Sequence, residues 1–489
     1  MRLRETLALL GEIMMLFSLS FLAPLAVALY CGTSIEPFLI PLVMSLLSGV
    51  LLRSLGNGEE IGVREAFLLV SLAWMSIAAF GALPYIIAGK GSTASPLNAL
   101  FESMSGFTTT GATVMANFSI HSQAILFWRQ LTQWLGGMGI VVLAIAILPR
   151  LSVGGSELMA LEAPGPQLEK LTPHIRNTAG IFWMIYTGLT AMEMLILSAL
   201  HYTGLAPRMT PYMALLHSFT TMSTGGFSPL SQSIKAFSPA VQWVIAVFMV
   251  FAGANFALFW YLLRRDYRII RNEEFRWYIL AILGLSLLIV PYLMRQFGFN
   301  ILTAFRQALF QVSSIVTTTG YATMDFSKWI LPVQFVLFFA MFLGGSSGST
   351  AGSIKIIRWV IALKAAKREL LYAFHPKMIA NIRLGGLKVE ESSIRSVLAF
   401  IVLYFVIFFA SSLFVVLNGA AVRLGLAGAM SAVAATLGNI GPGIGAIGPM
   451  ANYLIFPPQT RALMIVLMWF GRLEVVTVLV IFTRSYWRW

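Results

Sequence analysis

The sequence has little of the chemistry that enzymes and metal proteins use. It contains one cysteine, Cys31, which excludes an intramolecular disulfide and a metal site built from cysteines. Its five histidines are scattered, without the paired spacing of a zinc site. We find no nucleophile, general base or metal-ligating cluster, so we do not expect an enzyme. Only 11% of the 489 residues are charged and 58% are hydrophobic, a composition unlike that of a soluble domain.

Acidic residues are also scarce, because 19 Asp and Glu stand against 33 Lys and Arg, for a net charge of +14. The basic residues flank apolar runs and do not form a separate domain, so nucleic-acid binding is not expected. They cluster between residues 264 and 276, between 355 and 395, and at Arg150, Lys170 and Arg176. By the positive-inside rule we expect these loops, and with them both chain termini, in the cytoplasm.

Long apolar runs are what the sequence has in abundance, and about 20 residues are enough to span a bilayer. Runs near 7–30 and 37–55 come first. The first is too long for the core of a signal peptide and carries Glu12, so we expect a retained helix. After them a unit recurs four times: a span, a short helix, a glycine-centred loop and a second span. The first spans are expected near 66–88, 179–200, 277–294 and 397–417, the short helices near 96–108, 211–222, 302–316 and 424–437, and the second spans near 123–148, 240–263, 330–363 and 461–483.

The expected fold is an all-α polytopic membrane protein, with four pseudo-symmetric span–half-helix–span (M1-P-M2) units around a central pore and two additional N-terminal transmembrane helices. Twelve helical residues rise about 18 Å and cannot cross a hydrocarbon core of about 30 Å. Each short helix is therefore expected to enter the membrane and return through its loop. The expected segments are the two N-terminal helices in 1–60 and pore repeats in 61–150, 151–270, 271–375 (with a broken second helix) and 376–489.

Four short stretches that look like copies of one another predict an ion filter. They are Thr109-Thr110-Gly111, Ser223-Thr224-Gly225, Thr318-Thr319-Gly320 and Asn439-Ile440-Gly441. A dehydrated K⁺ in a narrow pore needs protein oxygens in place of water, and successive backbone carbonyls can supply them. Glycine tolerates the backbone dihedrals that this requires, and the C-terminal ends of the short helices favour a cation. We therefore expect K⁺ to bind at these twelve residues.

A run of small residues interrupts the second span of the third unit. It comprises Gly345, Ser346, Ser347, Gly348, Ser349, Thr350, Ala351 and Gly352. Glycine and serine favour a broken helix, and the run lacks the Gly-Lys-Ser/Thr ending of a phosphate-binding loop. It directly follows Phe342-Leu343-Gly344, one of four aromatic-x-Gly motifs that recur after the glycine loops. We expect it just below the filter, as an obstruction that moves aside; a passive hinge is the alternative.

Arg472 is expected to form the second part of this gate. The other repeats have Gly137, Ala254 and Gly345 at the corresponding position. An arginine at mid-membrane is costly and normally faces a water-filled interior or a partner. We expect it below the filter, as an electrostatic barrier that pairs with carbonyls of the Gly/Ser run. The alternative is a salt bridge with a buried acid such as Glu102 or Glu193.

Two further polar residues lie on the short helices. Glu102 lies nine residues before Gly111, and it either concentrates cations near the mouth or hydrogen-bonds the filter backbone. The corresponding positions are Leu216, Gln311 and Ala432. His217 is expected to be packed and hydrogen-bonded rather than a ligand. Asp325, just outside the third loop, is a better candidate for electrostatics at the mouth.

With these motifs the sequence resembles the TrkH/KtrB/HKT superfamily of cation transporters. The resemblance rests on Thr-Thr-Gly-Ala-Thr at 109–113, Ser-Thr-Gly-Gly-Phe at 223–227, Thr-Thr-Gly-Tyr-Ala at 318–322 and Asn-Ile-Gly-Pro-Gly at 439–443, and it covers essentially the whole chain. The N-terminal pair of spans, the Gly/Ser run and Phe-Gly-Arg-Leu-Glu at 470–474 resemble the bacterial TrkH branch.

This resemblance implies potassium uptake across the bacterial inner membrane by a homodimer in which each protomer has its own pore. It implies a cytoplasmic nucleotide-binding ring of TrkA type as regulator, with ATP, ADP or NAD as its nucleotide. It implies lipid around the spans and no organic cofactor in this chain. In the family, glycine at all four filter positions goes with potassium preference.

A proton- or sodium-coupled secondary cation transporter is the alternative function. It would need an ion site at a broken helix. The spans lack buried acid pairs, but Glu12, Glu102 and Glu193 leave this alternative open. A membrane scaffold without transport offers no reason for four matched glycine loops.

Overall fold

A computed structural model describes residues 2–57, 61–139, 175–266, 272–378 and 380–488. The predicted extension of the first unit's second span to residue 148 lies outside the described residues. So do the basic residues Arg150, Lys170, Arg268 and Arg271.

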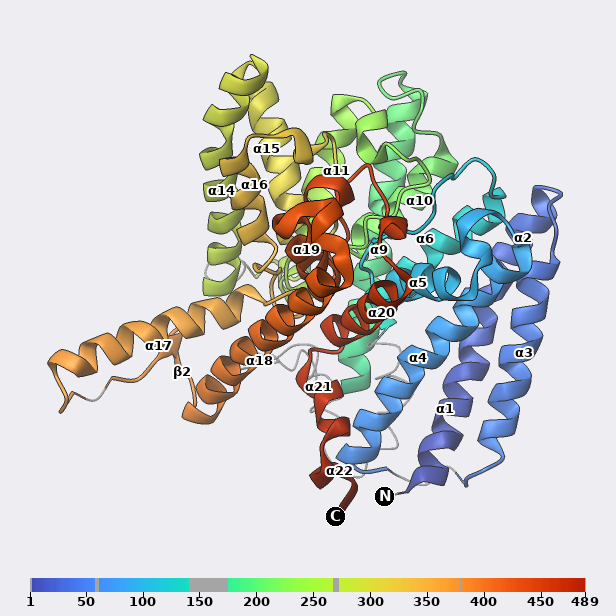
Figure 1. Ribbon diagram of the computed structural model, residues 1–489, viewed down its shortest axis with the longest axis horizontal. Coiled ribbons are helices and arrows are strands. Elements are labelled where there is room, and N and C mark those ends of the chain that lie inside the picture. Colours follow the sequence, from blue (N-terminus) through green and yellow to red (C-terminus); the bar gives the residue numbers. More distant parts are fainter. Residues whose placement is uncertain (1, 58–60, 140–174, 267–271, 379, 489) are drawn as a thin grey trace.

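The N-terminal third of the molecule begins with two antiparallel apolar helices. The first runs through α1 (Leu3–Ser18), η1 (Leu19–Phe21) and α2 (Leu22–Tyr30), and the second is α3 (Glu36–Arg53). They pack closely where glycines meet: a Cβ added to Gly11 would lie 2.5 Å from the carbonyl oxygen of Gly49. Figure 1 shows this pair beside α4, at the edge of the molecule. Both predicted N-terminal helices are therefore confirmed.

The order of long helix, short helix, loop and helix recurs four times, as predicted. The long helices are α4 (Val63–Ala88), α9 (Ile175–Tyr202), α14 (Glu273–Phe297) and α18 (Glu391–Val415); the short ones are α5 (Pro96–Phe107), α10 (Pro211–Met222), α15 (Ile301–Val316) and α19 (Ala421–Leu437); the helices after the loops are α6 (Gln123–Gly137), α11 (Pro239–Ala252), α16 (Leu331–Ala340) and α20 (Pro458–Arg472). Local signals start the short helices: the side chains of Thr210 and Asn300 cap α10 and α15, and proline occupies the first turn of α5 and α10.

Shorter elements connect these helices. They are η2 (Gly91–Ala94), η4 (Ser233–Ala236), α12 (Phe256–Leu263), η5 (Phe326–Lys328), α17 (Ile356–Phe374), the two-residue hairpin β1 (Arg383–Leu384) and β2 (Leu387–Lys388), the π-helical turn η6 (Val416–Ala420), η7 (Gly445–Ile447), η8 (Tyr453–Ile455), α21 (Val476–Leu479), η9 (Val480–Phe482) and α22 (Arg484–Arg488).

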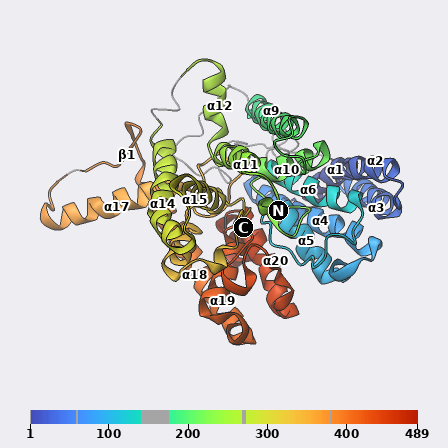
Figure 2. The same cartoon turned by 90° about the horizontal axis from the view of Figure 1, so that it is seen from above.

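The four units surround a common centre. Seen from above, α14 and α15, α10 and α11, α4 to α6, and α19 and α20 lie on four sides of that centre (Figure 2). Helix α5 packs against both α6 of its own unit and α20 of the last unit, so the ring of units closes. The core of the molecule is the apolar packing between neighbouring units, including Met104, Ile315 and Leu437, which are fully buried.

The second spans differ from the prediction, because they break more often than expected. A break was predicted only in the third unit, where α16 ends at Ala340 and α17 begins at Ile356. In the second unit α11 and α12 are bent by 98°, and in the fourth α20 and the segment Val476–Phe482 are bent by 110°. The prediction of continuous second spans over 240–263 and 461–483 is therefore wrong. The described part of the chain has six helices long and apolar enough to cross a membrane, or up to eight if each bent pair is one span.

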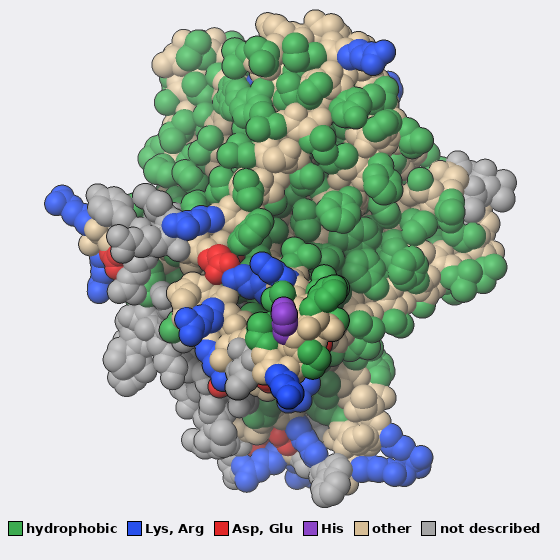
Figure 3. Space-filling model, turned by 90° about the vertical axis from the view of Figure 1, so that its left-hand side faces the viewer, with side chains coloured by type: hydrophobic (Ala, Val, Ile, Leu, Met, Phe, Trp, Pro, Cys, Tyr) green, Lys and Arg blue, Asp and Glu red, His purple; other side chains and the backbone are tan. Residues whose placement is uncertain are grey.

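Both ends of the described chain lie at the same end of the molecule, beside the start of α4 (Figure 1). The backbone nitrogen of Arg2 donates to Glu65, and the hydroxyl of Tyr486 donates to the carbonyl oxygen of Arg64 at 2.7 Å. On the face that carries α14 and α17, hydrophobic side chains cover the upper part, whereas Lys and Arg gather below (Figure 3). This face is thus divided into an apolar band and a basic end.

Candidate ion pathway

Each short helix ends in a loop of the same backbone shape. We call the segments 108–112, 223–227, 317–321 and 438–442 the glycine loops. In each, the second residue after the helix has a left-handed backbone and so does the fourth. The second residues are Thr109, Thr224, Thr318 and Asn439, with φ between 52° and 58°, and the fourth are Gly111, Gly226, Gly320 and Gly441, with φ between 71° and 97°. Non-glycine residues rarely adopt this region, so four strained residues at matching positions indicate a shared task.

The shared backbone shape corrects the register of the second glycine loop. The sequence pattern aligned Gly225 with Gly111, but Gly226 is the fourth residue after its helix and carries the positive φ. Hydrogen bonds agree, since the amide nitrogen of Gly225 bonds to the carbonyl oxygen of Thr220, as that of Thr110 does to Ser105. Gly225 therefore corresponds to Thr110, one position before the ring glycine.

The four glycine loops close into a ring in which each touches the next. A Cβ added to Gly111 would come within 3.0 Å of the carbonyl oxygen of Gly225. The same Cβ on Gly226, Gly320 and Gly441 would come within 3.0 Å of the carbonyl oxygens of Thr319, Ile440 and Thr110, respectively. The order of contacts runs from the first loop through the fourth and back to the first. Only glycine fits at these four positions, and each faces a backbone carbonyl of its neighbour.

A hollow opens on one side of the ring. It is lined by all four ring glycines, together with Arg129, Asn452 and Tyr453. The hydroxyl of Tyr453 donates to the carbonyl oxygen of Gly441 at 2.6 Å. The hollow therefore lies directly against the ring, a position that suits the mouth of an ion pathway.

The fourth glycine loop has no hydroxyl beside its glycine, and the structure shows what replaces it. The amide Nδ2 of Asn439 donates to Thr110 Oγ1 and to the carbonyl oxygen of Met468, both at 2.9 Å. In the first and third loops hydroxyls pair within the loop: Thr108 with Thr110 at 2.8 Å, and Thr317 with Thr319 at 2.7 Å. Asn439 thus ties the fourth loop to the first.

The Gly/Ser run lies against the other side of the ring. Its last residue reaches two of the glycine loops, because the amide nitrogen of Gly352 donates to Thr318 Oγ1 at 2.7 Å and a Cβ there would lie 2.5 Å from the carbonyl oxygen of Gly438. Thr350 Oγ1 donates to the carbonyl oxygen of Met222 at the end of α10. The run therefore contacts the ends of three of the four short helices or the loops that follow them.

Arg472 is buried beside this run and is held by backbone oxygens. Its Nη1 donates to the carbonyl oxygen of Thr350 at 2.9 Å and lies 3.3 Å from Thr109 Oγ1. Its Nη2 donates to the carbonyl oxygens of Gly136 and Gly137 at 2.7 and 2.9 Å. The predicted pairing with the Gly/Ser run is confirmed. The alternative of a salt bridge is not what the described residues show, since the ion pair of Glu102 is with Arg129.

Sequence reasoning missed a group of charges on the side of the run that faces away from the ring. A second, small cavity there is lined by Gly352, Lys355, Arg472 and Glu474, among others. Lys355 is buried and donates to the carbonyl oxygen of Ala351, and Arg358 forms an ion pair with Glu474. Lys355 and Arg358 had been counted only as basic residues of a loop. Both residues closely follow the Gly/Ser run in the sequence, and this short spacing was the signal that could have placed them beside it.

Glu102 and His217 turn out to be equivalent residues in two repeats, each five positions before the end of its short helix. Glu102 accepts from the amide nitrogen of Val114 at 2.9 Å, so it holds the backbone after the first ring glycine and is fully buried. His217 contacts the carbonyl oxygen of Met213 and the hydroxyl of Ser228, as expected of a packed histidine. The predicted equivalence of Leu216 with Glu102 is therefore wrong by one residue.

Asp325 and Glu193 are two further acids considered from the sequence. Asp325 caps η5 by accepting from the amide nitrogen of Ser327 at 3.1 Å, and it faces Lys328 at 4.0 Å. Glu193 is fully buried on α9. Neither residue lines the two cavities described above.

Comparisons with known proteins find relatives over the whole length of the chain. A family of cation transport proteins, TrkH, matches residues 37–290 and 298–488. The chain is 38% identical to the Trk system potassium uptake protein TrkH of Halomonas elongata and 37% identical to that of Escherichia coli strain K12, with 100% of both chains covered in each case. Among solved structures, the crystal structure of the potassium transporter TrkH from Vibrio parahaemolyticus matches with a TM-score of 0.86 and 34% identity over 100% of both chains.

Proposed function

This chain belongs to the TrkH family of cation transport proteins, and on that premise we propose that it takes up potassium through a pore enclosed by the four glycine loops. The family transports ions and is not a family of enzymes. The single observation that supports the pore most strongly is the closed ring in which Gly111, Gly226, Gly320 and Gly441 each face a carbonyl of the neighbouring loop.

In this proposal a potassium ion enters from the hollow beside the ring and exchanges its water for protein oxygens. The carbonyls and hydroxyls of the glycine loops supply them, and the C-terminal ends of α5, α10, α15 and α19 add favourable potential. The expected ion-binding residues are those predicted from the sequence, with Gly226 taking the place of Gly225 as the ring glycine. Four separate loops at matched depth provide the coordination number that a single loop lacks.

We assign the gate to residues 345–352 and Arg472. The run lies across the path below the ring, and Arg472 brings a positive charge that repels a cation in a cavity from which water is largely excluded. The guanidinium also holds the run closed by its bond to the carbonyl oxygen of Thr350. Opening then requires the run to move and the charge of Arg472 to withdraw together.

The surroundings of the pore complete the proposal. We propose that the protein lies in the bacterial inner membrane with both termini and the basic end in the cytoplasm, divided into the five segments predicted from the sequence. It acts as a homodimer surrounded by lipid, and a TrkA-type ring that binds ATP, ADP or NAD opens the gate from the cytoplasmic side. The basic end shown in Figure 3 is the surface available to that partner.

Ion flux into proteoliposomes, with and without the cytoplasmic partner, tests the proposal. We expect K⁺ to enter along its own gradient, at a rate the partner raises, and Na⁺ to enter far more slowly. Uptake that needs a proton or sodium gradient would favour the coupled secondary transporter instead, with the buried Glu193 as its first candidate ion site. Equal K⁺ and Na⁺ rates would contradict the filter.

A further inference from the structure

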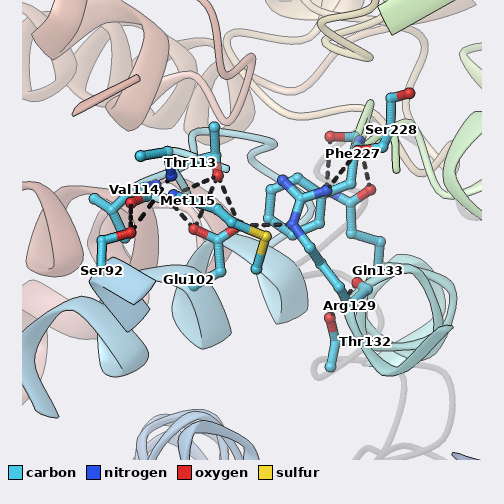
Figure 4. Close-up of polar contacts among 12 residues, drawn as sticks. Ser92, Glu102, Thr113, Val114, Met115, Arg129, Thr132, Gln133, Phe227 and Ser228 are labelled. Atoms are coloured by element: carbon cyan, nitrogen blue, oxygen red, sulfur yellow. Dashed lines mark hydrogen bonds and ion pairs between the residues drawn. The ribbon is translucent and has the colours of Figure 1, made fainter. Parts of the chain in front are cut away.

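A buried ion pair links the first and second glycine loops from behind, and the proposed transport mechanism does not use it. Arg129 on α6 and Glu102 on α5 are 1% and 0% exposed. The Nε of Arg129 lies 2.7 Å from Oε1 of Glu102. Figure 4 shows Glu102 directed toward Thr113 and Val114, and Arg129 directed toward the segment with Phe227 and Ser228. The two charges therefore stand between two loops of the ring.

Glu102 holds the first loop. Its carboxylate accepts from the hydroxyl of Thr113, which lies 2.8 and 3.0 Å from the two oxygens, and from the amide nitrogen of Val114 at 2.9 Å. These are the second and third residues after Gly111. The carboxylate thus fixes the backbone where it leaves the ring.

Arg129 holds the second loop at the corresponding place. Its Nη1 donates to the carbonyl oxygen of Ser228 at 3.0 Å, and its Cζ lies 3.4 Å from the centre of the Phe227 ring. Phe227 and Ser228 are the first and second residues after Gly226. Because the guanidinium is planar and donates in several fixed directions, it sets the relative position of its carboxylate and carbonyl partners.

Gln133, one helical turn beyond Arg129, secures the second loop on both sides of its ring glycine. Its Nε2 donates to the carbonyl oxygen of Gly225 at 2.7 Å, and its Oε1 accepts from the amide nitrogen of Phe227 at 3.0 Å. The carbonyl of Gly225 is the one that Gly111 faces in the ring. A side chain of α6 therefore aims the very oxygen at which the first and second loops meet.

The other three repeats fill the same positions with apolar side chains. Counted from the N-caps Ser122, Ser238, Ile330 and Pro457, the position of Arg129 is occupied by Ile245, Leu337 and Met464, and that of Gln133 by Met249, Met341 and Met468. All six apolar residues are buried. Filling the space behind a glycine loop thus requires no charge, and the polar set is peculiar to the first unit.

A buried ion pair is weak evidence for stability, because taking two charges out of water costs about as much as their attraction returns, and apolar residues of similar size often replace such pairs without loss. The three apolar repeats illustrate that replacement within one chain. Arg129 and Gln133 add contacts of defined direction on either side of Gly226: three hydrogen bonds to the backbone and one contact with the ring of Phe227.

We propose that Arg129, Glu102 and Gln133 are positioning residues for ion discrimination, which brace the first and second glycine loops at a fixed separation so that the ring cannot contract around a smaller cation. This inference rests on the proposed pore. Sodium is smaller than potassium and is discriminated against only if the coordinating oxygens cannot close in on it, so loosening one corner of the ring admits sodium.

The test compares the ratio of initial K⁺ to Na⁺ uptake into proteoliposomes at equal amounts of folded protein. Gln133→Met introduces the residue of the other repeats and leaves no charge unpaired. The double variant Arg129→Met with Glu102→Gln introduces side chains found at the equivalent positions of the fourth and third repeats. We expect each to lower the ratio about tenfold, within the range of coupling energies between contacting residues. Arg129→Lys keeps the positive charge but loses the forked donor geometry of the guanidinium. Its K⁺/Na⁺ ratio is expected to lie between those of the wild type and the double variant.

Met464→Leu, at the equivalent position of the fourth repeat, is the matched control and is expected to leave the ratio unchanged. Substituting a residue that only stabilised the fold would lower the yield and the total flux and leave the K⁺/Na⁺ ratio unchanged. That result in Gln133→Met and in the double variant would overturn the inference. Gly111→Ser in the same assay separates the two proposals. If Gly111→Ser lowers the ratio while Gln133→Met and the double variant do not, the positioning role is wrong and the proposed filter stands. If Gly111→Ser does not lower the ratio, the proposed filter and the positioning role are both wrong.

Discussion

Arg472 and Thr350 are 122 residues apart in the sequence, yet Nη1 of Arg472 donates to the carbonyl oxygen of Thr350 at 2.9 Å. The same guanidinium bonds to the carbonyl oxygens of Gly136 and Gly137 in the first unit. One side chain of the fourth unit therefore joins the Gly/Ser run of the third unit to the helix end of the first. The proposed gate and the first unit share this single cation, so we expect its removal to act on both.

Arg472→Ala is expected to raise K⁺ uptake in the absence of the cytoplasmic partner by at least about tenfold, since an arginine charge at mid-membrane is worth a few kcal/mol. Deleting part of residues 346–352 is expected to do the same by removing the obstruction. Because Arg472 holds the run, the two effects are expected to be non-additive in the double variant. The measurement is partner-free uptake into proteoliposomes for both single variants and the double variant.

Arg472→Lys serves as the control, since it keeps the charge but cannot make the paired bonds to Thr350 and Gly136. Its basal flux is expected to lie between those of the wild type and Arg472→Ala. Wild-type flux in a correctly folded Arg472→Ala protein would mean that this residue lies off the ion path.

The ring register predicts which glycine of the second loop cannot change. Gly226→Ala places a Cβ within 3.0 Å of the carbonyl oxygen of Thr319 at a φ of 71°, so we expect K⁺ uptake to fall at least about tenfold. Gly284→Ala on α14, where a Cβ would meet open space, is the control and is expected to transport normally. Wild-type uptake and selectivity in Gly226→Ala would restore Gly225 as the ring glycine.

The pair of Arg358 and Glu474 predicts a stability effect on the far side of the gate. Arg358 is almost fully buried in this ion pair and lies over the ring of Phe400 at 3.7 Å. Glu474→Gln leaves the guanidinium buried without a counter-charge, and we expect a loss of about 3–5 kcal/mol, seen as a lower thermal unfolding temperature in detergent. The double variant with Arg358→Met is expected to lose less than Glu474→Gln alone. A double variant as unstable as the sum of the singles would contradict the coupling.

The basic end predicts where the proposed regulator docks. Neutralising Arg264 and Arg265, both exposed after α12, is expected to weaken binding of the cytoplasmic ring at least about fivefold at low salt and less at high salt. Neutralising Lys90 and Arg208, which are exposed at the other end of the molecule, is the control. If a pull-down retains the partner equally in both variants, the arginines contribute topology and attraction to anionic lipid instead.

The short helices show how far local signals in the sequence reach. The predicted range 211–222 coincides with α10, and 96–108 and 302–316 differ from α5 and α15 by one residue. Proline in the first turn, a capping side chain before it and glycine after it are all within one helix length, so the sequence alone contains them. The four-fold repeat, the long apolar spans and the pairing of Arg472 with the Gly/Ser run were predictable for the same reason: each follows from spacing.

Two features of the second unit were not predictable. Ser223-Thr224-Gly225 matches Thr-Thr-Gly better than its neighbour does, and only the end of α10 at Met222 shows that Gly226 is the ring residue. The bend of 98° between α11 and α12 falls in an apolar segment with no proline, where the side chain of Asn255 caps the new helix. Residue similarity does not report where a helix ends, because that depends on which neighbour satisfies the freed backbone groups.

The sequence by itself determined the class of protein, the number of repeats and the ring glycines of the first, third and fourth loops, because hydrophobic length and glycine spacing act along the chain. Only the tertiary structure decided which groups meet behind the ring. Arg129 bonds to a carbonyl 99 residues away, and Asn439 to a hydroxyl 329 residues away. Such contacts form where four units close around one centre, so they are set by the packing of the units and not by any pattern within one of them.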